Sequence, residues 1–286
     1  MSLVETSWLE ENINKVKIID CSWHMPQTKR NGFNEYHKEH IPNAIFFDLD
    51  KNSKLDTDLP HMLTDTKSWE EAVSNMGIEN DDEIVIYDNS DVISSCRCWY
   101  NLIYFGHNPK LVHVLDGGLK KWKKENKITN NKTVSSTPSN YKANENKKLV
   151  KDKQEIDKNI SENEFNVIDA RSRERFEGKV AEPRKGLRSG CIQDSYCLPF
   201  SELINEDHTF IDKDKIFEKI NKKFSKEKLK YFIVVFLTFI YFKIIQIPFF
   251  FANQIHFKNL ISITLLISLI TLLFSLNQEK KYFGAV

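Results

Sequence analysis

The five cysteines of this 286-residue chain are its strongest nucleophiles and can also hold a metal ion. They are Cys21, Cys96, Cys98, Cys191 and Cys197. Zinc sites use closely spaced pairs such as Cys-x-x-Cys, and the five positions do not form such a set, so we expect no metal site. A thiol can otherwise serve as a nucleophile, which requires the thiolate form near neutral pH.

The surroundings of the chain can be predicted from its charge and its first residues. Lys and Arg number 41 and Asp and Glu number 40, so the chain has no basic excess to neutralise phosphates, and we expect no nucleic-acid partner. The first residues lack the basic and apolar regions of a secretory signal. Together with the reduced thiols that we expect, this predicts a cytoplasmic location.

Short apolar runs alternate with helical patterns along the first half of the sequence. Alternation of this kind is typical of an α/β fold with a mainly parallel sheet and helices on both faces. The length allows about two such domains. The expected strands are Val16–Asp20, Ala44–Phe47, Glu83–Asp88 and Leu111–Leu115, and the expected helices are Ser68–Met76 and Ser94–Phe105.

The second half repeats the pattern of the first. Asn166–Asp169 repeats Lys17–Asp20 at an offset of 149 residues, and the same offset maps Ile84–Tyr87 onto Ile233–Phe236. Repetition in the same order predicts the duplication of one domain-sized unit. Between the halves, residues 126–148 are rich in Asn, Lys, Ser and Thr. We expect them to form a linker that contributes nothing to a core.

Six segments carry the most specific motifs of the chain. They are His40–Asp48, Phe105–His107 and Leu115–Trp122 in the first half, and Ile168–Ser172, Arg175–Gly178 and Glu182–Gly186 in the second. Together they resemble the motifs of two-domain rhodaneses, the thiosulfate and 3-mercaptopyruvate sulfurtransferase family. The resemblance covers roughly residues 7–236 and departs from the family at Gly190–Asp194, where Gly-His-Ile-Pro-Gly is usual.

The resemblance implies tandem rhodanese-like domains that transfer sulfane sulfur from thiosulfate or 3-mercaptopyruvate to cyanide or a thiol through a cysteine persulfide. It implies no metal or organic cofactor, and we expect a monomer. Anionic donors need guanidinium groups nearby, and the resemblance assigns substrate binding to Arg175 and Arg184. Without it, an arginine in a charged loop is more often a solvated partner in a surface ion pair.

The thiols and histidine in these segments have structural interpretations. Cys96 and Cys98 follow an acidic run, Asn89–Asp91, which would raise a thiol pKa, so we expect small packed side chains there and likewise at Cys191 and Cys197. We expect His40 to fix the loop that leads into the second strand. The Asp116-Gly117-Gly118 turn is assigned no chemistry.

The catalytic cysteine that the resemblance requires is not found where it is expected. In the family it follows the strand that corresponds to Ile233–Phe236, but the next residues here are Leu237–Phe242, and no cysteine follows Cys197. The domain prediction is therefore a rhodanese-like domain at 1–125, a linker at 126–148, and an incomplete one at 149–236 that lacks its active loop. A separate apolar tail occupies 237–286.

Two interpretations of the tail remain open. Residues 231–276 contain two formal charges, Lys243 and Lys258, so they could form a membrane hairpin and place the protein at a membrane. Alternatively, the tail is an out-of-frame reading of AT-rich DNA. We favour the second, because an anchor is expected after a completed domain. The leading hypothesis is thus a sulfurtransferase that is inactive as written, and its alternative is a non-catalytic anion-binding or membrane-tethered module.

Overall fold

The computed structural model describes residues 2–57, 59–183 and 187–222. The chain divides into two compact units, Met1–Asp212 and Lys213–Val286. Arg184, the predicted strand at 233–236 and the tail at 237–286 lie outside the described residues. The elements below belong to the first unit.

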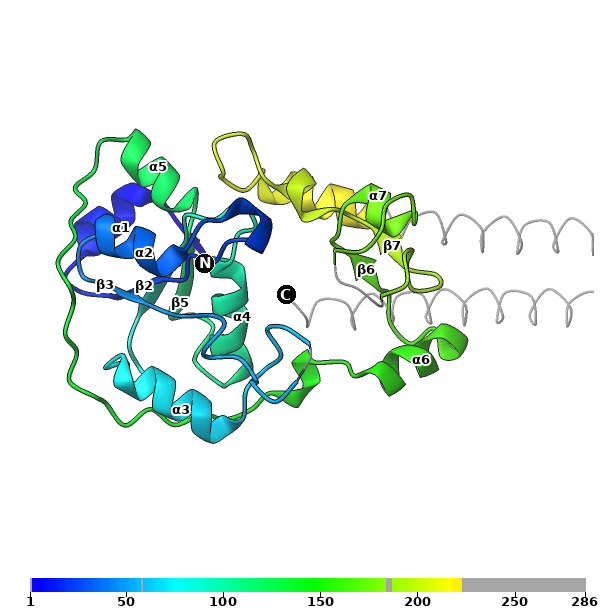
Figure 1. Ribbon diagram of the computed structural model, residues 1–286, viewed down its shortest axis with the longest axis horizontal. Coiled ribbons are helices and arrows are strands. Elements are labelled where there is room, and N and C mark those ends of the chain that lie inside the picture. Colours follow the sequence, from blue (N-terminus) through cyan, green and yellow to red (C-terminus); the bar gives the residue numbers. More distant parts are fainter. Residues whose placement is uncertain (1, 58, 184–186, 223–286) are drawn as a thin grey trace, which may run out of the picture. The chain divides into compact units, whose positions relative to one another are not determined.

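Five parallel strands form the main sheet, in the order β1-β5-β4-β2-β3. Each neighbouring pair runs in the same direction, so helices must connect the strands across the faces of the sheet (Figure 1). The strands are β1 (Leu3–Val4), β2 (Lys17–Asp20), β3 (Ala44–Phe46), β4 (Ile84–Tyr87) and β5 (Val112–Leu115). This confirms the predicted α/β architecture with a parallel sheet.

Helices bury both faces of the sheet. Ile84 and Ile86 of β4 pack in one apolar cluster with Trp69, whereas the alternate residues Val85 and Tyr87 pack in a second cluster. The first cluster is covered by α3 and α4, and the second by α1, α2 and α5. The helices of this half are α1 (Thr6–Asn12), the 3-10 helix η1 (Pro26–Thr28), α2 (Gly32–Lys38), α3 (Thr66–Asn75), α4 (Ser95–Tyr104) and α5 (Gly118–Lys124).

The turn between β5 and α5 lies against the loop that follows β4. Gly117 and Gly118 both have positive φ, 84° and 53°. A Cβ on Gly118 would lie 2.5 Å from the carbonyl oxygen of Asp88, so a larger residue would push the two loops apart. The Gly-Gly pair therefore brings these loops together at the carboxyl edge of the sheet.

The segment 126–148 is not a simple linker. Tyr141 is fully buried in the cluster under α3 and α4, and its ring stacks on His107 at 5.8 Å between centroids. The backbone N–H of Asn144 donates to the carbonyl of Phe105 (2.9 Å). The expectation that this stretch contributes nothing to a core is wrong, because one aromatic side chain is enough to anchor an otherwise polar strap.

A small second sheet follows this strap. Its two strands are parallel, with Ile168 opposite Tyr196 and Asp169 opposite Cys197. A capping box between Asp152 and Glu155 begins the preceding helix. The elements are η2 (Lys147–Leu149), α6 (Lys153–Glu162), β6 (Ile168–Asp169), α7 (Arg173–Phe176), β7 (Tyr196–Cys197) and η3 (Phe200–Leu203).

The two halves share local geometry. Asp20 ends β2 and accepts a hydrogen bond from the Ser22 N–H at 2.9 Å, and Asp169 ends β6 and accepts one from the Arg171 N–H at 2.9 Å. Each strand pairs in parallel with the strand that follows it. This is what a duplication requires, although the duplication itself stays a prediction.

No helix among the described residues is both long and apolar enough to cross a bilayer. The stretch 231–276, considered above as a membrane hairpin, lies outside those residues.

The buried Asp20 generates a prediction about pH. Burial raises the pKa of Asp20 from 3.8 to about 6. Between these values the folded chain holds a proton that the unfolded chain has lost, so stability falls as pH rises through this window. Asp20→Asn keeps an acceptor for Ser22, and we expect it to raise the free energy of unfolding at pH 8 by up to about 3 kcal/mol, with little effect at pH 4.

Urea unfolding followed by tryptophan fluorescence measures this effect, because all five tryptophans lie between Trp8 and Trp122. Asp169→Asn is the control. A hydrogen bond from Arg171 lowers the pKa of Asp169, so this variant should give no gain at pH 8. Equal stability of Asp20→Asn and wild type at pH 8 would contradict the prediction.

Candidate functional site

The loops at the carboxyl ends of the parallel strands are where a sheet of this kind places its ligands. The loop between β4 and α4 is the one that corresponds, by the 149-residue offset, to the position expected for a nucleophile. Its first residue is Asp88, which is buried.

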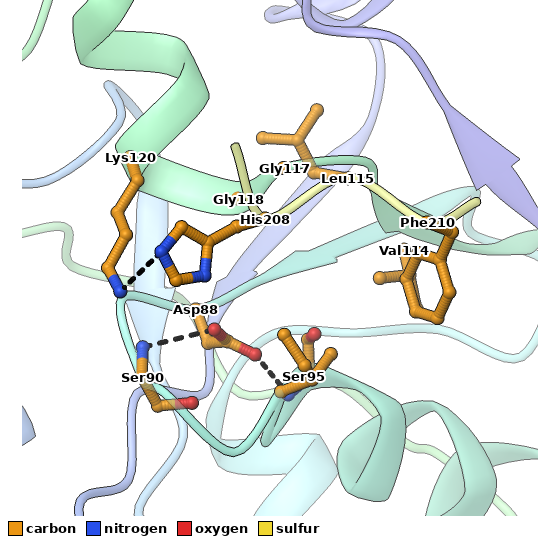
Figure 2. A pocket seen from close by; sticks show the side chains of 11 residues that line it. Asp88, Ser90, Ser95, Val114, Leu115, Gly117, Gly118, Lys120, His208 and Phe210 are labelled. Carbon is orange, nitrogen blue, oxygen red and sulfur yellow. Dashed lines mark hydrogen bonds between the residues drawn. The ribbon is translucent and has the colours of Figure 1, made fainter. Parts of the chain in front are cut away.

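The Asp88 carboxylate accepts hydrogen bonds from backbone N–H groups of its own loop. Ser90 N donates to Oδ1 (3.1 Å) and Ser95 N donates to Oδ2 (2.7 Å), as Figure 2 shows. Ser95 begins α4, so the carboxylate also lies at the positive end of that helix. An anion cradle of the kind that could stabilise a thiolate exists here, but a side chain of the protein fills it.

The same edge contains a lysine that is already paired. Lys120 Nζ donates to His208 Nε2 (3.0 Å), as Figure 2 shows, and it also donates to Asp91 Oδ1 (2.6 Å). The cavity that remains beside Asp88 has a volume of about 10 Å³. That is room for one water molecule at most, so no substrate fits between these side chains.

Two thiols, Cys96 and Cys98, follow this loop in the first turn of α4. Cys98 is fully buried. Burial, with a smaller contribution from the charge of Asp88, raises the pKa of Cys96 to about 12, which agrees with the expectation of packed, unreactive side chains. Cys197 lies buried on β7, and Cys191 is half-buried. His40 is also buried, with its ring nitrogens 2.7 and 3.1 Å from the carbonyl oxygens of Tyr36 and Lys132, as expected for a structural role.

A histidine and carboxylate pair lies in the loop after β3. His61 Nε2 is 2.8 Å from Asp50 Oδ1, and Trp23 Nε1 donates to both oxygens of Asp50, at 3.2 and 3.0 Å. Arg97 of α4 donates to the His61 carbonyl. A carboxylate that orients an imidazole is the arrangement of a general base. This pair was not predicted from the sequence, since both residues lie in a polar loop without periodicity.

In the second half, Arg175 forms an ion pair with Glu182. Its Nη2 donates to Glu182 Oε2 (2.5 Å) and its Nε to Oε1 (3.3 Å). Arg171 Nη1 donates to the same Oε1 (2.8 Å), and the rest of the Arg171 guanidinium is held by Asp169 and the Gly190 carbonyl. The structure therefore places the predicted Arg175 in an ion cluster. Its predicted partner Arg184 lies outside the described residues.

Comparison with known proteins gives consistent results. The family model "Rhodanese-like domain" matches residues 5–125. Two Arabidopsis thaliana proteins are similar over 79% of this chain: thiosulfate/3-mercaptopyruvate sulfurtransferase 1, mitochondrial, at 35% identity, and thiosulfate/3-mercaptopyruvate sulfurtransferase 2, at 33%. The chain spans 64% of the length of the first and 71% of the second.

Two solved structures are similar to this one. SseA from Escherichia coli, described as a 3-mercaptopyruvate sulfotransferase, superposes with a TM-score of 0.71 at 29% identity. That match covers 78% of this chain and 84% of SseA. Tum1 from Saccharomyces cerevisiae superposes with a TM-score of 0.70 at 27% identity and covers 79% of each chain.

The raised pKa of Cys96 predicts slow chemical modification. A pKa of about 12 against an ordinary value near 8.5 leaves on the order of 10³-fold less thiolate at pH 7.5. We expect iodoacetamide to modify Cys96 in the folded protein at least about 100-fold more slowly than it modifies free cysteine. Peptide mass spectrometry over a time course measures this rate, with urea-unfolded protein as the control. Modification of Cys96 at the rate of free cysteine would contradict the site description.

Proposed function

Because the chain belongs to the thiosulfate/3-mercaptopyruvate sulfurtransferase family, we propose that it binds the anionic sulfur donors of that family at Arg175 and Arg184. We propose also that, with the sequence as written, it forms no cysteine persulfide. The ancestral reaction is transfer of sulfane sulfur from thiosulfate or 3-mercaptopyruvate to cyanide or a thiol. Its covalent intermediate needs one activated cysteine.

The observation that carries this proposal is the environment of the thiols. All five cysteines of the chain lie within the described residues. Burial raises the pKa of Cys96, and Cys21 and Cys98 are fully buried. Where the first half has a loop of converging N–H groups, Asp88 occupies it. A neutral thiol does not attack a sulfur donor, because the thiolate is the nucleophile.

Donor binding is supported by the guanidinium nitrogen of Arg175 that makes no hydrogen bond to Glu182. The bonds to Glu182 use Nε and Nη2, and the described residues offer no acceptor to Nη1. A guanidinium held in this way still presents planar donors to a carboxylate or sulfonate. The side chain is one-third exposed, so an anion can reach it.

The remaining parts of the interpretation belong to the same proposal. We propose domains at 1–125 and 149–236, a monomeric protein and a cytoplasmic location, although one relative is named as mitochondrial. We propose that residues 237–286 do not continue the second domain. Sequencing the transcript and translating all frames beyond the codon for Lys230 tests this. A cysteine-containing loop in another frame supports it, and its absence from every frame opposes it.

The first functional prediction concerns sulfur transfer. The purified full chain should form thiocyanate from thiosulfate and cyanide no faster than buffer, because removing the nucleophile removes both half-reactions. The assay is colorimetric, with an active two-domain sulfurtransferase as positive control. Turnover at enzyme-like rates that disappears in Cys96→Ser would contradict the proposal and place the reactive thiol in the first half.

The second functional prediction concerns the donor site. Arg175→Lys keeps the charge but loses the planar fork, so the affinity for thiosulfate should fall by roughly 10- to 150-fold, which corresponds to one charge-assisted hydrogen bond. Isothermal titration calorimetry measures it. Arg173→Lys is the matched control, since Arg173 is also on α7 but pairs with Glu202. Equal affinities for wild type and Arg175→Lys would show that Arg175 is only a surface charge.

A further inference from the structure

Glu182 is the most deeply buried charged side chain of the arginine cluster. Its side chain is 4% exposed, whereas those of Arg171 and Arg175 are 30% and 33% exposed. A carboxylate is withdrawn from water to this extent only when it is well paired. Both of its oxygens accept from guanidinium groups, and the hydrogen bond from Arg175 lowers its pKa.

The guanidinium group of Arg171 is held in place by several hydrogen bonds. Its Nε and Nη2 bind Asp169 at the end of β6, and Nη2 also donates to the Gly190 carbonyl (2.8 Å). Glu182 binds both Arg171 and Arg175 and so connects Arg171 to α7. The orientation of Arg175 is thereby tied to the sheet through three successive ion pairs, Arg175–Glu182, Glu182–Arg171 and Arg171–Asp169, rather than to its own short helix alone.

The charges of the cluster cancel. Asp169, Arg171, Arg175 and Glu182 contribute two positive and two negative charges. An incoming anion therefore gains little from the net charge of these four groups. It gains from directed N–H groups, whose value depends on how well they are held in place.

We propose that Glu182 is a positioning residue, which bridges Arg171 and Arg175 and fixes the Arg175 guanidinium for the anionic sulfur donor. This inference rests on the proposed function, in which Arg175 contacts that donor. A positioning role and a purely electrostatic role of Glu182 predict opposite changes in anion binding when its carboxylate is lost. Loss of a negative charge alone would strengthen anion binding, whereas loss of the bridge would weaken it.

The test compares Glu182→Gln with Glu177→Gln in the full chain, using thiosulfate as the probe. Glu177 lies in the same segment and pairs with Lys179. Its replacement therefore removes the same charge but no partner of Arg171 or Arg175. We expect the dissociation constant to rise about tenfold or more in Glu182→Gln and to stay within about twofold of wild type in Glu177→Gln. Unchanged or tighter binding by Glu182→Gln would overturn the proposal.

A second measurement does not depend on ligand. In protein labelled with ¹⁵N-arginine, the Nε–H signal of Arg175, assigned with Arg175→Lys, should exchange slowly with water in wild type and Glu177→Gln and rapidly in Glu182→Gln. Slow exchange in Glu182→Gln would overturn the bridge. If wild type binds no thiosulfate, the proposed function fails, and this exchange rate alone decides whether Glu182 positions Arg175. Thermal unfolding checks that all variants are folded.

Discussion

Converging N–H donors need a negative charge where they meet, and in this protein the chain's own carboxylates supply it. Asp88 receives the N–H groups of the loop after β4. Asp169 and Glu182 receive the guanidinium groups of Arg171 and Arg175. In the first case the internal carboxylate leaves a cavity of about 10 Å³, which excludes a substrate. In the second case Glu182 accepts from Nε and Nη2 of Arg175, and the described residues offer no acceptor to Nη1. Only the second arrangement therefore leaves a donor available for an anionic ligand.

The parts of the structure that could be predicted from the sequence are those that bury apolar side chains in a regular pattern. The run Ile84–Tyr87 became β4 because both of its faces are covered, and the spacing of Trp69 and Val73 placed α3 correctly. Tyr141 was missed because it is a single aromatic residue in a polar stretch. The Asp50 and His61 pair was missed because loops bring polar residues together without any periodicity in the sequence.

Matched positions of the two halves differ in burial, and the difference explains why the halves differ in regularity. Ile19 of β2 is 1% exposed, but Ile168 at the corresponding position of β6 is 38% exposed. The described part of the second sheet has two strands, and two strands do not create two covered faces. Local features such as the Asp20 and Asp169 turns persist because they need only neighbouring backbone.

Donor binding and sulfur transfer make different demands on a fold of this kind, which is why one can persist without the other. The arginine cluster is built from β6, α7 and the segment that contains Glu182, all close in sequence and held by local ion pairs. A thiolate cradle instead needs a buried strand whose following loop converges on the sulfur, and the sheet must hold that strand on both sides. Arginines bind substrate and transition state alike, whereas the nucleophile acts only in the reaction. In the function proposed above, a chain with the first arrangement and no activated thiol retains donor recognition without sulfur transfer.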